Sequence, residues 1–549
     1  MDSLKPMLLT SLKSYDKSQF FKDVTAGIIV AIIALPLSIA LALASGVGPE
    51  AGIFTAIVAG FVISALGGSS VQIAGPTAAF ATIVAGIVAK NGMDGLIIST
   101  ILAGIFLLIM GLCHFGSLIK FIPYTITTGF TSGIAVTIVI GQLKDFFGIT
   151  YQNGEAPIET IEKLEAVFKN FSTFNINALI IGIISLAILI ISPYIFKKIP
   201  GSLIAVIAGI VMVKFLPLKA NTIGDLYTIS NSLPAFHLPK VNLEIIEQSA
   251  SDAFTIAILA AIESLLSCVV ADGMINGKHR SDMELVAQGA GNIASALFGG
   301  IPATGAIART AANIKNGGRT PIAGMVHSIT LVIVLVVLMP YAGLIPMPTI
   351  AAILFMVAYN MCQWRTFVDL VKTAPKSDII VLLTTFFLTV LFDLVVAIEI
   401  GMVLACLLFI KRMSEETHVD SWTYVDDDTP DINENLKKLP LQIRVYEITG
   451  PLFFGAADAI EHIVVKDFTK CLVIRMRSVP ALDTTAMNAL KNLAKVCQAK
   501  GIAMVFSHVN EQPMHVMEKA GFVEIIGEEN FRPNISAALE RAEEIITVS

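Results

Sequence analysis

The sequence predicts a polytopic α-helical membrane protein followed by a small soluble α/β domain. Of its 549 residues, 55% are hydrophobic and 15% are charged, whereas soluble domains carry about 25% charged residues. Charged residues are sparse before about residue 410 and ordinary after it. Two of the apolar segments are also interrupted by Gly and Pro at matching places in the two halves of the membrane part. Such interrupted segments are typical of transporter binding sites.

The apolar segments define the domain organisation. Roughly fourteen of them, within residues 23–412, can cross a bilayer or, where broken, reach half-way into it. Lys and Arg gather in alternate connections, so the positive-inside rule places the N-terminus (1–22) in the cytoplasm of a cell (inner) membrane protein. With that orientation, two halves of seven spans run in opposite directions, as an inverted repeat does. The polar, acidic stretch 413–440 is expected to be a linker.

The two interrupted segments, Gly67–Ala89 and Gly299–Thr320, share one pattern. Each opens with two glycines, continues with a short extended stretch, and then becomes helical. The extended stretch is expected at Val71–Ala74 in the first segment, and the helix of the second is expected to begin at about Ile307. One segment enters from the cytoplasm and the other from outside, so both helices would begin near mid-membrane, facing each other. The alternative is a pair of tightly packed, kinked helices.

The start of a half-helix favours an anion. Its free backbone N–H groups and the positive end of its dipole both attract negative charge. The candidate residues at these starts are Thr77, Ala78, Ala79, Ala306, Ile307 and Ala308. Their mostly small side chains let an anion approach the backbone, although small residues are also common packing devices in membranes. Arg309 adds a fixed charge and forked donors.

Glu263 lies in the middle of an apolar run. An intramembrane carboxylate is costly in its charged form and indicates a function, here the binding and release of a proton. Ser267 lies one turn further on the same helical face. We predict that ionised Glu263 competes for Arg309, and that protonated Glu263 frees the site for an anion. The alternative is a permanent structural ion pair between Glu263 and Arg309.

The C-terminal region, 441–549, alternates strands and helices and predicts a small α/β domain. The strands are expected at Leu441–Ile448, Cys471–Met476, Ile502–Ser507 and Val523–Ile526. A second feature is the run Asp483, Thr484 and Thr485 between a strand and a helix. It is either a helix N-cap or a regulatory site for phosphorylation or for docking of a cytoplasmic partner.

Several function classes lack support. The net charge of −6 argues against nucleic-acid binding. The six cysteines are scattered without metal-ligand spacing. The sequence has no P-loop, no HExxH motif and no Ser/His/Asp signature, so we predict no enzyme activity, no cofactor and no metal.

The chain from Phe21 to its end resembles the sulfate-permease (SulP) family of anion transporters, which are relatives of prestin and of bacterial bicarbonate and dicarboxylate carriers. The most specific pieces are VQIAGPTAAF, IESLLSCVVADGM and GGIPATGAIARTAANIKNGGRTP. The C-terminal domain is similar to STAS domains. The resemblance implies secondary transport of a small inorganic or carboxylate anion, such as sulfate, bicarbonate or a dicarboxylate.

The resemblance also implies a homodimer that works by an elevator mechanism. A core domain (23–113 and 250–340) would move against a gate domain (121–217 and 344–412). The family's substrate site lies between the two half-helices and spans one and eight, which adds Leu37 and Leu41 to the candidate residues.

Two departures from the family pattern affect these expectations. Sodium-coupled bicarbonate relatives have Asp and Thr where this chain has Glu263 and Ser267, which favours proton symport over sodium coupling. The STAS switch motif usually ends in Gly, whereas this chain has Ala486, which weakens the phosphorylation hypothesis.

Other readings stay open. An anion exchanger and a sodium-coupled bicarbonate symporter would use the same architecture. An anion channel and a STAS-based membrane signalling protein are further alternatives. A nucleobase–cation symporter would need polar groups where this chain has Leu37, Leu41 and Ala306.

Overall fold

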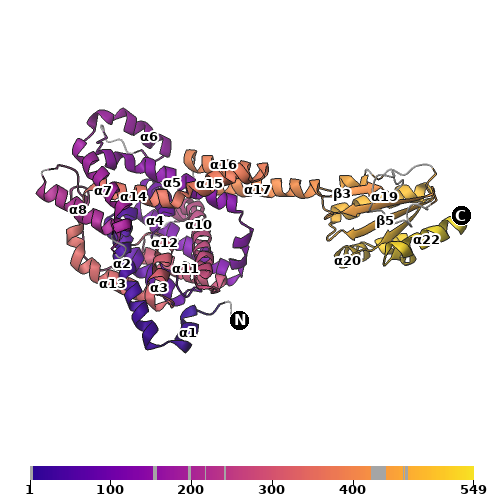
Figure 1. Cartoon of the computed structure of the whole chain (residues 1–549), viewed down its shortest axis with the longest axis horizontal. Coiled ribbons are helices and arrows are strands. Elements are labelled where there is room, and N and C mark those ends of the chain that lie inside the picture. The colour runs from indigo at the N-terminus through magenta and orange to yellow at the C-terminus, as the bar shows by residue number, and fades with distance from the viewer. Residues whose placement is uncertain are drawn as a thin grey trace. The chain divides into compact units, whose positions relative to one another are not determined.

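The computed structural model describes residues 4–151, 157–195, 199–216, 218–239, 243–392, 394–421, 440–461, 463 and 468–548. The chain divides into two compact units, Met1–Met402 and Val403–Ser549. The first unit is almost entirely helical, and the second consists of a sheet covered by helices (Figure 1). Helix α17 (Leu394–Glu415) contains the boundary between them.

The long helices of the first unit form two packing groups. The group that surrounds the interrupted segments consists of α2 (Lys17–Ala44), α3 (Pro49–Leu66), α4 (Ala81–Leu112), α10 (Leu243–Ile275), α11 (Ser281–Leu297), α12 (Ile307–Lys315) and α13 (Ile322–Ala342). The second group consists of α5 (Tyr124–Phe147), α7 (Ile176–Ile195), α8 (Gly201–Phe215), α14 (Met347–Cys362) and α16 (Lys376–Leu391). Helix α2 of the first group also touches α5, α8 and α14 of the second.

The other elements of this unit are short. They are α1 (Met7–Ser11), η1 (Leu12–Ser14), η2 (Ala78–Phe80), η3 (Phe115–Phe121), α6 (Thr160–Lys169), η4 (Phe171–Thr173), α9 (Ile223–Leu226) and α15 (Trp364–Thr373), with strands β1 (Ala74–Gly75) and β2 (Thr304–Gly305).

Within the described ranges, eight helices are long and apolar enough to cross a membrane. The predicted count of roughly fourteen spans includes shorter and broken helices as well and stays a prediction. One such break lies inside α4, where Gly92 has φ 67° and ψ −167°. Glycine adopts this conformation without steric cost, so the chain can turn there and begin a second helix.

The second unit contains a five-stranded sheet of order β3-β4-β5-β6-β7. Its strands are β3 (His418–Ser421), β4 (Ile443–Thr449), β5 (Cys471–Ser478), β6 (Ala503–Ser507) and β7 (Phe531–Arg532). Its helices are α18 (Asp458–Glu461), α19 (Thr484–Ala499), α20 (Glu511–Lys519), α21 (Phe522–Ile526) and α22 (Ile535–Val548), with η6 at Glu528–Asn530. Strand β3 pairs antiparallel with β4, and the other neighbours are parallel.

Two sequence predictions for this unit differ from the structure. The predicted strand Val523–Ile526 is wrong, because these residues lie in helix α21 and the last strand is β7. A short run with three apolar residues, Val523, Ile525 and Ile526, fits either a strand or a helical turn, and Phe522, which precedes it and begins α21, is fully buried. The predicted linker 413–440 begins with the end of α17 and with β3, while its residues 422–439 lie outside the described residues.

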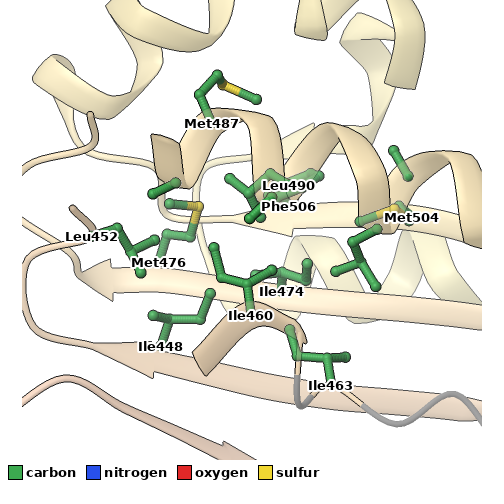
Figure 2. Close-up of a cluster of buried hydrophobic side chains, with 14 of the residues drawn as sticks. Ile448, Leu452, Ile460, Ile463, Ile474, Met476, Met487, Leu490, Met504 and Phe506 are labelled. Carbon is green, nitrogen blue, oxygen red and sulfur yellow. The ribbon is translucent and has the colours of Figure 1, made fainter. Parts of the chain in front are cut away.

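The sheet of the second unit is covered on both faces, as a parallel sheet requires. Alternate residues of its strands point to opposite faces. Figure 2 shows one face, where Ile474 and Phe506 of the sheet lie beneath Leu490 of α19. On the other face, Val473 packs with Ala542 of α22.

Candidate functional site

The two interrupted segments meet in a short antiparallel strand pair. Ala74 lies opposite Gly305, and Gly75 lies opposite Thr304. Directly after these strands, η2 begins behind its N-cap Thr77 and continues into α4, and α12 begins behind its N-cap Ala306. The two helix starts therefore lie next to each other, as the sequence predicts. The strand is shorter and later than the expected Val71–Ala74.

Side chains of α12 form hydrogen bonds with the extended stretch that leads into β1. The Thr310 hydroxyl accepts a hydrogen bond from Ile73 N at 3.0 Å, and Asn313 Nδ2 donates to Val71 O at 2.8 Å. The backbone N–H of Ala306 donates to Ile73 O at 2.9 Å. Buried backbone groups are costly without partners, so these bonds make the non-helical backbone tolerable at this depth.

A buried carboxylate anchors the entry to the same stretch. Glu284, in the first turn of α11, is 1% exposed. Its oxygens accept hydrogen bonds from Gly68 N at 2.9 Å, from Ser69 N at 3.2 Å and from Gln72 Nε2 at 3.1 Å. Gln288 Nε2, one turn further along α11, donates to it at 2.9 Å. Hydrogen bonds to a carboxylate are strong, so α11 holds the first interrupted segment in place.

Arg309 is buried between the two helix starts and is 3% exposed. Its Nη2 donates to Pro76 O at 3.1 Å and lies 3.5 Å from Ser38 Oγ of α2. Its Nη1 has no hydrogen-bond partner in the described part of the chain. A Cβ atom at Gly75 would contact Nη1, so the glycine leaves the space that the guanidinium fills. The site thus contains a buried cation whose Nη1 group has no partner among the described residues.

Glu263 lies on α10 against the other helix start. Its Oε2 accepts a hydrogen bond from the Thr77 hydroxyl at 3.0 Å. Thr77 makes no side-chain cap bond to its own helix, because its hydroxyl points to the carboxylate instead. Neither the predicted contact of Glu263 with Arg309 nor the alternative permanent ion pair is present among the described residues.

Ser264 is a site residue to which the sequence interpretation gave no role. It follows Glu263 directly, and its hydroxyl lies 2.6 Å from Thr304 Oγ1 and accepts from Gly305 N at 3.1 Å. Ser267, which the sequence places on the face of Glu263, is 1% exposed, and its hydroxyl is unpartnered within the described ranges. The signal for Ser264 was its position next to an intramembrane carboxylate, but only the orientation of α10 against β2 decides between the two serines.

The remaining candidate residues surround this centre. Leu37 and Ala306 are partly exposed, and Leu41 and Ala78 are buried. Ile307 and Ala308, in the first turn of α12, are exposed. Helix α2, which carries both leucines, packs against α12 and reaches Arg309 through Ser38. Because Thr77 is also partly exposed, accessible positions occur at both helix starts.

The predicted N-cap in the second unit is confirmed. Asp483 Oδ1 accepts from Ala486 N at 2.8 Å at the start of α19, and its Oδ2 accepts from Phe454 N at 2.9 Å. Thr484 and Thr485 are exposed in the first turn. A regulatory role of these residues stays a prediction. Within the described ranges, no cluster of His, Cys, Asp and Glu could hold a metal ion.

These features define a class of protein: a polytopic membrane transporter with two broken segments that meet at a buried cation, joined to a small α/β domain. Comparison with protein families matches residues 20–385 to the sulfate permease family and residues 437–538 to the STAS domain. The chain belongs to the sulfate permease family. The predicted class of a polytopic α-helical membrane protein with a C-terminal STAS domain is thereby confirmed, while the inverted repeat of fourteen spans stays a prediction. Members of this family are transporters rather than enzymes.

Relatives and solved structures agree with this assignment. The chain is 39% identical to the putative sulfate transporter YvdB of Bacillus subtilis, over 94% of this chain and 97% of that protein. It is 32% identical to the bicarbonate transporter BicA of Picosynechococcus sp., over 86% of this chain and 85% of BicA.

Solved structures are also similar in fold, and two of them serve as examples. The transmembrane domain of a cyanobacterial BicA matches with a TM-score of 0.63 and 30% identity, covering 70% of this chain and 98% of that domain. Murine Slc26a9 in its inward-facing state matches with a TM-score of 0.88, covering 98% of this chain and 94% of that one. Its identity of 18% supports the fold alone.

Proposed function

We propose that this protein is a secondary active carrier that takes up a small anion together with a proton. Sulfate, bicarbonate and dicarboxylates are the candidate substrates, and relatives named as sulfate and bicarbonate transporters support this class. The observation that carries the proposal is the buried Arg309 guanidinium between two adjoining helix starts, with Nη1 left without a partner in the described part of the chain.

The anion would bind at these helix starts. The candidate contacts are Thr77, Ala78, Ala306, Ile307, Ala308 and Arg309, with Leu37 and Leu41 forming an apolar wall. A buried donor without a partner costs about 1–3 kcal/mol, and more where it is charged. An anion that accepts a hydrogen bond from Nη1 would remove this cost. The dipoles of the two half-helices add a favourable field in the same place.

Glu263 would couple the proton through electrostatics rather than by competing directly for Arg309. It bonds Thr77, while Arg309 bonds the neighbouring Pro76, so both groups act on one short stretch of backbone. For an assumed separation of about 7 Å between the carboxylate and the anion, and an effective dielectric constant of about 20, the repulsion opposes binding by about 2 kcal/mol. Protonation removes this repulsion and would strengthen anion binding by about 30-fold.

Transport would follow an elevator mechanism in a homodimer. The helices that surround the site pack with one another. The second group of helices, α5, α7, α8, α14 and α16, touches them along α2 and, through α5, at η2 and α4. The first group would carry the anion across the membrane against the second. The positive charge of alternate connections favours a cytoplasmic N-terminus and STAS domain.

The test is uptake into proteoliposomes of labelled sulfate, bicarbonate and a dicarboxylate, each with an imposed proton gradient, a sodium gradient or neither. We expect saturable uptake of at least one anion and stimulation by an inward proton gradient. Glu263→Gln should abolish the stimulation while saturable binding remains. Glu399→Gln is the matched control, because Glu399 is an exposed carboxylate of α17 away from the strand pair.

The other outcomes separate the alternatives. Stimulation by sodium alone would identify a sodium symporter, and a requirement for an anion inside the vesicle would identify an exchanger. Flux that does not saturate would identify a channel. After deletion of 440–549, a carrier should keep measurable anion binding, whereas a signalling protein should lose its output. If Glu263→Gln keeps its response to the proton gradient, proton coupling through this residue is wrong.

A further inference from the structure

Helix α15 (Trp364–Thr373) is unlike the other helices between the spans. Its ten residues are too few to cross a bilayer, which needs about 20. It connects α14 to α16, and none of its residues is buried. The ring of Phe367 lies 5.2 Å from that of Phe386 on α16, and the helix also touches α5. One side of α15 is therefore attached to the protein, and the rest of its surface is open.

The open surface is divided into sectors around the helix axis. Successive residues turn by about 100°, so residues three or four apart share a face. The protein-facing side contains the half-buried residues Thr366, Phe367, Leu370 and Val371. Next to it lie Trp364, 46% exposed, and Val368, 38% exposed. Beyond these apolar residues lie the exposed Arg365 and Lys372, and then the polar Asp369 and Thr373.

This order is the one that a helix needs at the surface of a bilayer. Such a helix turns an apolar edge toward the acyl chains and places basic side chains beside the headgroups. Tryptophan and tyrosine favour the same depth, and Trp364 Nε1 lies 3.4 Å from the Tyr359 hydroxyl. The guanidinium of Arg365 lies 5.6 Å from the centre of the Trp364 ring. The aromatic pair thus lies directly beside the basic residues, as the interfacial aromatic belt of a membrane protein lies beside the lipid headgroups.

The basic side chains make no ion pair with the described part of the protein. Arg365, Lys372 and Lys376, which begins α16, are all exposed. None of them forms an ion pair with a residue that the structure describes. Three such cations beside an apolar edge complement the surface of a bilayer that has anionic headgroups above an apolar layer.

We propose that α15 is a binding site for anionic phospholipids in the bilayer interface. Trp364 and Val368 enter the edge of the hydrocarbon layer, and Arg365, Lys372 and Lys376 bind the phosphate groups of the lipid. Near an anionic surface, each basic side chain is worth about a fivefold preference. The proposed lipid site depends on the fold of the membrane unit and not on the identity of the transported anion.

The fluorescence of Trp364 can report whether α15 contacts lipid. The sequence holds two tryptophans, and Trp422→Phe leaves Trp364 as the only one. The full-length variant is reconstituted in phosphatidylcholine vesicles that contain, at equal mole fraction, either brominated phosphatidylcholine or brominated phosphatidylglycerol. Bromine quenches tryptophan only at contact. We expect quenching by both lipids, and several-fold stronger quenching per mole by the anionic one.

Charge variants test the specificity. Lys372→Gln with Lys376→Gln, which keeps the contact of Arg365 with the indole ring, should lower the ratio of the two quenching efficiencies severalfold. Lys90→Gln is the matched control, because Lys90 is exposed on α4, far along the chain from α15, and should leave the ratio unchanged. Both quenching efficiencies are measured on the same variant, so a change in the tryptophan emission of that variant cancels in their ratio.

Each contrary result overturns the proposal. If neither brominated lipid quenches Trp364 while aqueous iodide does, α15 faces water. If both lipids quench equally, α15 touches lipid but has no anionic site. If Lys90→Gln lowers the ratio as much as the α15 variant does, the preference comes from the overall charge of the protein.

Discussion

Replacing Gly75 with alanine displaces one group and leaves the backbone around it intact. A Cβ at this position would contact Arg309 Nη1, while the next nearest atoms, Cα and Cβ of Ala56, are 3.6 Å away. The φ angle of Gly75 is not positive, so the backbone at this position can accommodate alanine. The guanidinium is the far end of a flexible side chain. We therefore expect Gly75→Ala to fold and to shift Arg309 away from Pro76 O.

The magnitude follows from the hydrogen bonds that Arg309 loses. The bond to Pro76 O, now 3.1 Å long, positions Nη1 at the helix starts. A hydrogen bond of a charged group is worth about 1.5–3 kcal/mol. If the anion loses one such bond, its affinity falls by about 10- to 150-fold. Isothermal titration of the purified protein with the transported anion measures this change, and its melting temperature reports the fold.

Gly86→Ala is the matched control for this variant. Gly86 lies in the same half-helix, and a Cβ there meets nothing within 4 Å. Alanine in a helix interior is favoured over glycine by about 0.5–1 kcal/mol, so this variant should be as stable as the parent or more so, with unchanged affinity. Wild-type affinity of a well-folded Gly75→Ala protein would refute the assignment of the anion to Arg309. An equal loss in Gly86→Ala would refute the steric argument.

Three further predictions concern other contacts. Glu284→Gln places an amide donor among donors from Gln72 and the backbone, costs about 1–3 kcal/mol, and should lower the melting temperature of the intact protein. Asp483→Ala removes the cap of α19, costs about 1 kcal/mol, and should lower the midpoint of STAS-domain unfolding followed by circular dichroism. Burial raises the pKa of Cys471 to about 12 and that of Cys497 to about 11. Both thiols should therefore resist maleimide throughout the neutral and mildly alkaline range, and rapid labelling of either in the folded protein would contradict this.

The sequence predicts the main elements of the site because a glycine pair followed within ten residues by further Gly and Pro disfavours a continuous helix. The breaks before Thr77 and Ala306 are visible in the chain, and the start of α12 at Ile307 agrees with the prediction. The register of the strand pair could not be predicted, because two residues per strand carry no pattern. Its position follows from the hydrogen bonds that Thr310 and Asn313 make across the two segments.

Side-chain partners are the part that the sequence left undetermined. Glu263 was expected to contact Arg309, since opposite charges in a membrane attract strongly, yet it accepts from Thr77. The rotation of α10 about its axis decides which residue it meets, and that rotation depends on packing against α4, α12 and β2. A similar limit applies to α15, because the gathering of Lys and Arg in alternate connections indicates on which side of the membrane a connection lies but does not predict a helix within it.

The contacts across the strand pair favour one kind of movement. Arg309 of the second segment fills the space over Gly75 of the first, and Gln72 of the first lies against Gly305 of the second. Each helix start is thus shaped by a side chain from the opposite segment. Pulling the two starts apart would break these contacts together with the hydrogen bonds of β1 and β2, in a place where water cannot replace them. These shared contacts support the proposal that the two helix starts move as one body with their helix group.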